Sequence, residues 1–146
     1  DETAACATVR RKMRVLAAED NKTNQLVFRK MVKALDIELR FAGNGREAVE
    51  LYQSFAPDLV FMDISMPEMD GKAATRKIRE LEAVSGMRVP VLALTAHATG
   101  GDKEEIMAAG MDQFLTKPLR KAEIYSAIGA HQPGGVRPVV ADGAAA

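Results

Sequence analysis

The stretch LVFMDISMPEMDG, residues 59–71, decides the fold, because it joins an apolar run of strand length directly to an acidic residue. Four consecutive apolar residues, 59–62, are typical of a strand that is buried on both faces. A carboxylate at the mouth of such a strand is costly unless a partner compensates its charge. The stretch therefore indicates both a central strand and a functional acid, Asp63.

Outward from this strand, apolar runs of strand length alternate with segments of helical period. The five expected strands are residues 14–18, 37–41, 59–62, 91–94 and 113–115. This alternation predicts an α/β fold, a parallel sheet covered by helices on both faces. The strand at 37–41 alternates apolar and charged residues, so we expect it at an edge, with the first, third and fourth strands in the centre.

Apolar residues recur at helical spacing between the strands, and each such stripe is expected to face the sheet. The five stripes are Val27, Met31, Ala34 and Leu35; Ala48, Leu51, Tyr52 and Phe55; Ala74, Ile78 and Leu81; Ile106, Met107 and Ala109; and Ile124, Ala127 and Ile128. Gly43, Gly86 and Gly110 mark element ends, where a residue free to adopt positive φ is favoured.

The composition is that of one globular domain. The chain has 146 residues, 47% hydrophobic and 27% charged, and its 20 basic and 20 acidic residues cancel. Nothing in this balance points to nucleic acid or to a membrane surface. A single cysteine excludes an internal disulfide and fits the cytoplasm. We expect a domain at 13–131, an N-terminal tail at 1–12, and a flexible C-terminal tail or linker at 132–146.

Polar residues gather where the strands end. Glu19 and Asp20 follow the first strand, Asp63 ends the third, Thr95 the fourth, and Lys117 comes just after the fifth. In an open parallel sheet these ends meet at one edge, where the functional crevice lies. Any one of these residues could be a helix cap, a turn residue or a solvated charge, but together they indicate a site.

The three carboxylates predict a magnesium site. They repel one another, and a hard divalent cation with oxygen ligands relieves that repulsion. Mg²⁺ keeps several waters and accepts phosphate oxygens, Lys117 supplies a positive charge, and Thr95 supplies a hydroxyl. Asp63 can then act as an oxygen nucleophile and carry an aspartyl phosphate.

These residues resemble the receiver domain of two-component response regulators, over roughly residues 13–130. The resemblance rests on Glu19-Asp20-Asn21, MDISMPEMDG at 62–71, ALTA at 93–96 and TKPL at 116–119, all in family order. It implies a five-stranded, doubly wound, flavodoxin-like sheet of order 2-1-3-4-5 with five helices. It also implies phosphorylation of Asp63 by a phosphohistidine kinase or phosphotransfer protein.

The resemblance further assigns roles within the site. Asp20 and Asp63 are implied as direct Mg²⁺ ligands, Glu19 as a ligand through water, and the carbonyl of Ser65 as a further ligand. The phosphate-binding and switch positions are Thr95, Ala96, Phe114 and Lys117. Ser65 and His97 flank the path of attacking water, and His97 is a candidate for tuning the lifetime of the phosphorylated form. Many members have Asp where Glu19 stands and Tyr where Phe114 stands.

Other functions have less support in the sequence. A nucleotide-binding enzyme lacks support, because neither G-x-G-x-x-G after the first strand nor G-x-x-x-x-G-K-[ST] is present. A haloacid-dehalogenase-type phosphatase needs an acid where Ser65 stands. The string EDNKTNQLV, residues 19–27, resembles receivers fused to histidine kinases, so we expect a piece of a hybrid kinase. A stand-alone regulator and a receiver-like module without phosphorylation are the alternatives.

The chain is expected to catalyse only its own phosphorylation and dephosphorylation. It is also expected to bind a downstream protein through residues at about 101–130.

Overall fold

The structure is a computed structural model that describes residues 12–64, 69–86, 88–96, 100–117 and 119–131, with the backbone alone at 100–102. The expected tails at 1–11 and 132–146 lie outside these residues. Within the described part of the chain, no helix is long and apolar enough to cross a membrane.

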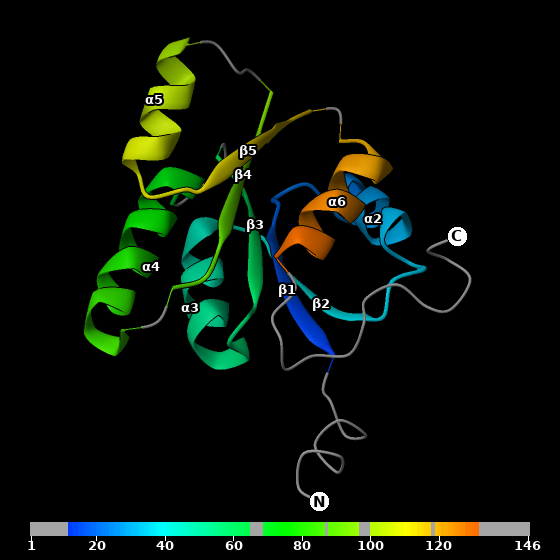
Figure 1. Cartoon of the computed structure of the whole chain (residues 1–146), viewed down its shortest axis with the longest axis horizontal. Coiled ribbons are helices and arrows are strands. Elements are labelled where there is room, and N and C mark those ends of the chain that lie inside the picture. Colours follow the sequence, from blue (N-terminus) through cyan, green and yellow to red (C-terminus); the bar gives the residue numbers. More distant parts are fainter. Residues whose placement is uncertain (1–11, 65–68, 87, 97–99, 118, 132–146) are drawn as a thin grey trace, which may run out of the picture.

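Five parallel strands form one sheet in the order β2-β1-β3-β4-β5, as expected (Figure 1). The strands are β1 Met13–Ala18, β2 Ile37–Ala42, β3 Leu59–Asp63, β4 Val91–Thr95 and β5 Gln113–Thr116. β1, β3 and β4 are almost wholly buried, whereas β2 at the edge alternates half-buried and exposed residues. The alternation in residues 37–41 therefore predicted the place of β2 correctly.

Five helices cover the two faces of the sheet (Figure 1). They are α2 Lys22–Met31, α3 Gly45–Phe55, α4 Gly71–Ser85, α5 Gly100–Ala108 and α6 Lys121–Ala130. One apolar core joins α2 and α6 to alternate residues of the central strands, such as Val15 and Phe61. The other joins α3, α4 and α5 to the intervening residues, such as Leu16 and Val60.

Two of the helix stripes were partly wrong. On α2 the buried residue is Phe28, while Val27 is 46% exposed. The helix ends at Met31, so Ala34, which is exposed, and Leu35, which is buried, lie beyond it. The reason is size: the Phe28 ring packs edge-on against Phe61, with ring centroids 5.2 Å apart, and an aromatic ring buries more apolar area than valine.

The second error concerns α5, where Met107 is 45% exposed although Ile106 and Ala109 are buried. The remaining stripes lie against the sheet, with Ala48, Phe55, Ala74, Ile78, Ile124, Ala127 and Ile128 buried and Leu51, Tyr52 and Leu81 half-buried. The hydrophobic period thus located every helix, but it extended the first one past Met31 and placed the exposed Val27 and Met107 on buried faces.

The glycine expectations were right at two positions of three. Gly86, which ends α4, has φ +79°, and Gly110, which follows α5, has φ +103°. Gly43 is not among the described residues with positive φ. Its backbone N–H instead donates to Glu47 Oε1 at 2.6 Å, so this turn is held by a side chain in the first turn of α3.

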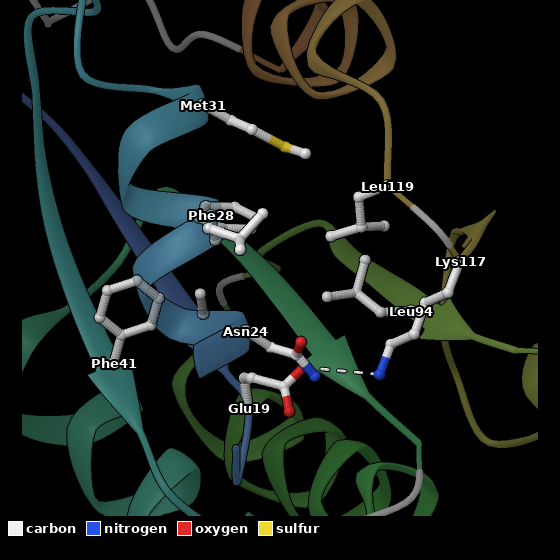
Figure 2. A pocket seen from close by; sticks show the side chains of 10 residues that line it. Glu19, Asn24, Phe28, Met31, Phe41, Leu94, Lys117 and Leu119 are labelled. Carbon is white, nitrogen blue, oxygen red and sulfur yellow. Dashed lines mark hydrogen bonds and ion pairs between the residues drawn. The ribbon is translucent and has the colours of Figure 1, made fainter. Parts of the chain in front are cut away.

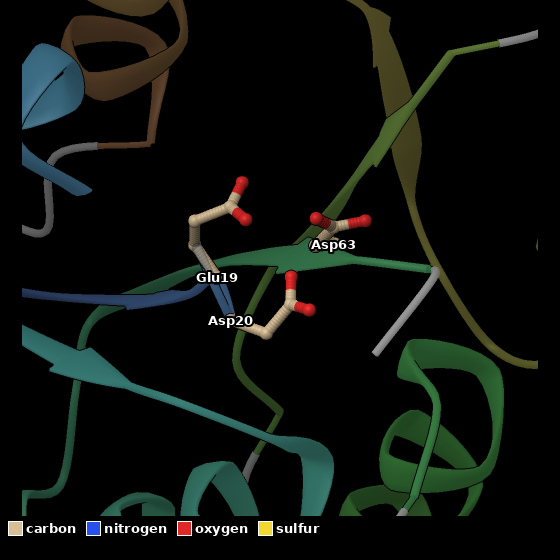
Figure 3. A group of neighbouring side chains, drawn as sticks. All are labelled: Glu19, Asp20 and Asp63. Carbon is tan, nitrogen blue, oxygen red and sulfur yellow. The ribbon is translucent and has the colours of Figure 1, made fainter. Parts of the chain in front are cut away.

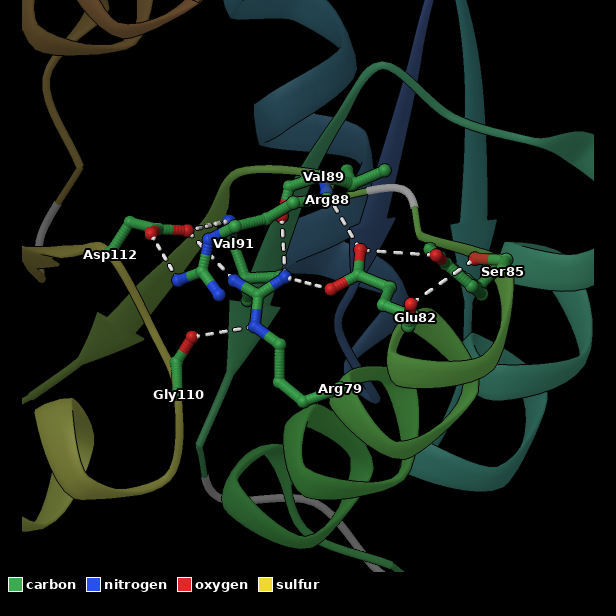
Figure 4. Close-up of polar contacts among 9 residues, drawn as sticks. Arg79, Glu82, Ser85, Arg88, Val89, Val91, Gly110 and Asp112 are labelled. Carbon is green, nitrogen blue, oxygen red and sulfur yellow. Dashed lines mark hydrogen bonds and ion pairs between the residues drawn. The ribbon is translucent and has the colours of Figure 1, made fainter.

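A polar network that the sequence did not reveal lies at the amino-terminal ends of β4 and β5 (Figure 4). The Arg79 side chain of α4 donates to the carbonyls of Gly110 and Val89, both at 2.8 Å, and pairs with Glu82 and Asp112. Glu82 is buried, yet its two carboxylate oxygens accept from Arg79 and from the Val89 N–H. The network ties α4 to the connections that precede β4 and β5, because each buried charge has a partner.

Tyr52 extends this network into α3, where its hydroxyl donates to Glu82 Oε2 at 3.0 Å. Burial, together with the neighbouring Glu82 carboxylate, raises the pKa of Tyr52 to about 12. This hydroxyl therefore stays protonated and remains a donor at neutral pH.

Replacing Asp112 by asparagine is expected to lower the free energy of unfolding at pH 7 by about 1–3 kcal/mol. Burial alone would raise the pKa of this carboxyl, but hydrogen bonds from Arg88 and the Val91 N–H and the charge of Arg79 lower it overall. A lowered pKa gives stability that is present above the usual value near 4 and is lost as pH falls through the lowered value.

The difference between wild type and Asp112→Asn in urea unfolding should therefore shrink between pH 5 and pH 2. Glu80→Gln, an exposed acid on α4, is the control and should change little at either pH. A constant difference across this range would contradict the ionic role of Asp112.

Candidate functional site

The polar residues singled out in the sequence meet at the carboxyl edge of the sheet. Asp63 is the last residue of β3, Thr95 is the last of β4, and Lys117 directly follows β5. The ladder continues past the strands, because the Lys117 N–H donates to the Thr95 carbonyl at 2.8 Å and the Ile64 N–H to the Leu94 carbonyl at 3.2 Å. Backbone pairing between strands thus fixes the positions of Asp63, Thr95 and Lys117.

The acidic pair lies in the turn from β1 to α2. The Glu19 N–H donates to the Ala42 carbonyl at 2.9 Å, and the Gln25 side-chain amide donates to the Glu19 carbonyl at 2.7 Å. Asn21 caps α2, with its Oδ1 accepting from Thr23 and Asn24 N–H groups, and its own N–H donates to Glu19 Oε2 at 3.0 Å. A capping residue is expected here, since the first N–H groups of a helix lack internal partners.

Lys117 joins Asp63 to Glu19. Its Nζ lies 2.8 Å from Asp63 Oδ2 and 3.4 Å from Glu19 Oε1. Only 2% of Asp63 and 6% of Glu19 are exposed. Such buried carboxylates need a positive partner, and Lys117 supplies one from the end of β5, which β4 separates from β3.

The carboxylates of Glu19, Asp20 and Asp63 converge, as Figure 3 shows. One oxygen from each lies within 4.8 Å of the others. Asp20 is exposed whereas the other two are buried, so the cluster is open to solvent on one side. Three hard oxygen donors in this arrangement fit a divalent cation that keeps part of its water shell.

The pKa values of Glu19 and Lys117 are both shifted within this cluster. Burial raises the pKa of the Glu19 carboxyl above its ordinary value, with the charge of Asp63 adding to the rise, while the Asn21 N–H and Lys117 oppose it. Partial burial alone would lower the pKa of Lys117, but the hydrogen bond and charge of Asp63 raise it overall. Lys117 thus supplies one positive charge to a cluster of three carboxyl groups, which leaves room for a further cation.

The predicted switch residues lie on β4, directly after it, and on β5. Thr95 is buried, Ala96 is an exposed bend residue directly after β4, and Phe114 on β5 is half-buried against the core under α4 and α5. Ser65 and His97, the predicted metal-ligand carbonyl and tuning positions, lie outside the described residues.

An apolar cavity of about 180 Å³ opens beside the site (Figure 2). Its walls come from α2, β2 and the segment after β5, and Glu19 and Lys117 stand at its polar side. The apolar lining includes Phe28, Met31 and Leu119. Val27, which is 46% exposed, also lines it.

Residues 15–129 match the family described as response regulator receiver domain. The chain belongs to this family. Over 120 residues this receiver domain is 38% identical to hybrid signal transduction histidine kinase I of Dictyostelium discoideum, an alignment that covers 79% of the chain and 7% of that protein. The receiver domain therefore spans only a small part of such curated relatives.

Two solved structures resemble the receiver domain closely. The receiver domain of sensor histidine kinase PA1611 from Pseudomonas aeruginosa, solved with a magnesium ion coordinated in its active site cleft, is 37% identical, with a TM-score of 0.74 over 82% of this chain and 97% of that one. The Saccharomyces cerevisiae complex of the histidine phosphotransfer protein Ypd1 with the receiver domain of Ssk1 gives 30% identity and a TM-score of 0.78, covering 84% and 90%. The flavodoxin-like fold is thereby confirmed, and the chain is a receiver domain of phosphorelay type.

Sequence reasoning missed the residues that support the acids. Gln25 had no assigned role, and Asn21 was expected only as part of the acidic motif, without its contact to Glu19. The glycines that begin α3 and α4, Gly45 and Gly71, were also missed. For the glycines a signal existed, because both open helices although helices rarely need glycine there.

Proposed function

We propose that Asp63 accepts a phosphoryl group from a phosphohistidine on another protein, with Mg²⁺ held by Glu19, Asp20 and Asp63. The observation that carries this proposal is the contact of Lys117 Nζ with Asp63 Oδ2 at 2.8 Å inside a cluster of three carboxylates. A nucleophile beside a fixed cation and a metal-binding cluster suits phosphoryl transfer, which depends on positioning and charge stabilisation.

In the proposed reaction an Asp63 carboxylate oxygen attacks the phosphorus of the donor. The new P–O bond forms as the P–N bond to the donor imidazole breaks, and that nitrogen keeps the electron pair and takes up a proton. Lys117 pairs with the phosphoryl oxygens as their charge shifts. Hydrolysis later returns Asp63 to the free carboxylate, so the chain turns over only its own phosphoryl group and is otherwise not an enzyme.

Mg²⁺ is the cation we favour. The donors are all carboxylate oxygens, and Asp20 leaves the cluster open to water and to phosphate. The magnesium ion in the PA1611 receiver domain supports this choice. When bound, the ion supplies positive charge that offsets the repulsion among the acids. The carbonyl of Ser65 remains our proposal for a further ligand.

Thr95, Ala96 and Phe114 form the proposed readout. A phosphoryl group on Asp63 places acceptor oxygens at the strand ends, toward which the Thr95 hydroxyl can turn. Thr95 and Phe114 lie on adjacent strands, where Thr95 pairs in register with Thr116, two residues after Phe114. We propose that the change reaches a downstream protein through the surface of α5, β5 and α6, where Lys103, Glu104 and Glu105 are exposed.

The donor is proposed to be a phosphohistidine kinase or phosphotransfer domain, in keeping with the Ypd1 complex. A protein donor must cover the edge beside Asp63, and the exposed Val27, which lines the same cavity as Glu19 and Lys117, offers an apolar contact there. The relative from Dictyostelium supports a hybrid histidine kinase as the parent protein, with a stand-alone regulator as the alternative. Phosphotransfer profiling against candidate donors identifies the partner.

The metal requirement is tested with acetyl phosphate as donor and intact mass as readout. Wild type is expected to gain one phosphoryl group in Mg²⁺ and none in EDTA. Asp20→Asn removes one carboxylate of the cluster and should raise the Mg²⁺ concentration for half-maximal labelling at least about tenfold. Asp36→Asn, a half-buried acid away from the cluster, should match wild type. Equal labelling with and without Mg²⁺ would sink the metal assignment.

A further inference from the structure

The turn between β2 and α3, residues 42–45, provides no carboxylate to the cluster, yet it contacts both chain segments that do. At one end, the Ala42 carbonyl accepts from the Glu19 N–H at 2.9 Å. At the other end, the Gly45 N–H donates to the Met69 carbonyl at 2.9 Å. This turn therefore bridges the acidic pair and the segment that follows Asp63.

Gly45 is required for space and not for backbone conformation. Its φ is not among the positive values of the described residues. A Cβ at this position would lie 2.1 Å from the Met69 carbonyl oxygen, whereas real Cβ atoms stay at least 3.0 Å away. Alanine is favoured over glycine in a helix by about 1 kcal/mol, so close approach of the two backbones is the reason for glycine here.

A second close approach continues the connection to Asp63. A Cβ on Gly71 would lie 2.3 Å from the Asp63 carbonyl oxygen, and the Gly71 N–H donates to the Ile64 carbonyl at 3.4 Å. The start of α4 is thus pressed against the backbone that carries the phosphoacceptor. The contacts run from Glu19 through Ala42, Gly45, Met69 and Gly71 to Asp63. Lys117, which contacts both Glu19 and Asp63, closes them into a ring.

We propose that the β2–α3 turn, acting through Gly45, sets the separation of Glu19 and Asp63 and so the affinity of the cluster for a divalent cation. Gly45 is then a positioning residue for a site to which it gives no ligand. This inference rests on the proposed metal binding at Glu19, Asp20 and Asp63. Mg²⁺ demands near-ideal octahedral geometry, and an added Cβ at Gly45 would need at least about 0.9 Å more distance from the Met69 carbonyl oxygen than the 2.1 Å that the two backbones leave.

Gly45→Ala is the test, with Mg²⁺ binding measured by titration calorimetry. We expect affinity at least about tenfold weaker than wild type. Acetyl phosphate labelling should need correspondingly more Mg²⁺ but reach a similar plateau rate, a split that general loosening of the fold does not produce. Gly129→Ala is the matched control, because its Cβ meets nothing within 4 Å, and it should bind Mg²⁺ as wild type does.

The outcomes separate this inference from the proposed function. If wild type binds no Mg²⁺, the proposed metal site fails and the inference with it. If wild type binds and Gly45→Ala binds equally, only the inference is overturned.

A second variant decides the matter if Gly45→Ala does not fold. Asn44→Ala removes the α3 cap, whose Oδ1 accepts from the Glu47 N–H at 2.8 Å, and loosens the same turn without adding atoms. It should weaken Mg²⁺ binding about two- to fivefold; wild-type affinity in this variant would equally overturn the inference.

Discussion

Lys117→Met is expected to slow phosphorylation by acetyl phosphate about 10²- to 10³-fold at saturating Mg²⁺. Methionine keeps the apolar stem of lysine and removes the Nζ that lies 2.8 Å from Asp63 and 3.4 Å from Glu19. The loss removes a fixed positive charge where charge shifts during transfer. The labelling rate, followed by intact mass, measures it.

The control for this variant is Lys33→Met, an exposed lysine after α2, which should label at the wild-type rate. Lys117→Met should also unfold more easily in EDTA, by about 2–3 kcal/mol, because two buried carboxylates lose their cation. An unchanged labelling rate in a folded variant would remove Lys117 from the reaction.

Asp63→Asn is expected to have the opposite effect on stability in EDTA and to lose the response to Mg²⁺. The change relieves repulsion among three carboxylates that lie within 4.8 Å, so we expect a gain of about 1 kcal/mol. Mg²⁺ at 100 times its Kd should stabilise wild type by about 2.7 kcal/mol. The same concentration should stabilise Asp63→Asn by less than about 1 kcal/mol.

Urea unfolding with and without Mg²⁺ measures both effects. Asp36→Asn serves again as control, and it should keep the full wild-type response to Mg²⁺. Equal stabilisation of wild type and Asp63→Asn would place the metal elsewhere.

Much of the fold was predictable because its signals are local. An apolar run such as Leu59–Asp63 has the length of a strand, and the alternation of apolar and charged residues in Ile37–Ala42 indicates an edge strand. The order of the strands followed from the family resemblance. The site was predictable for the same reason, since parallel strands deliver their terminal residues to one edge. Lys117 therefore contacts Asp63 although 54 residues separate them.

What the sequence did not show depends on contacts between distant residues. Arg79 binds Gly110 and Asp112, 31 and 33 residues away, and no local period encodes such a pairing. The need for glycine at position 45 likewise becomes visible only in the structure, where its backbone lies against the Met69 carbonyl. Val27 was misplaced because helical spacing alone cannot decide between adjacent residues such as Val27 and Phe28. The tuning role of His97 stays a prediction.

The most direct test of the account is the intact mass of wild type and Asp63→Asn after incubation with acetyl phosphate and Mg²⁺. We predict that wild type gains one phosphoryl group and that the folded Asp63→Asn variant gains none. An unmodified wild type, or the same added mass on Asp63→Asn, would contradict Asp63 as the phosphoacceptor.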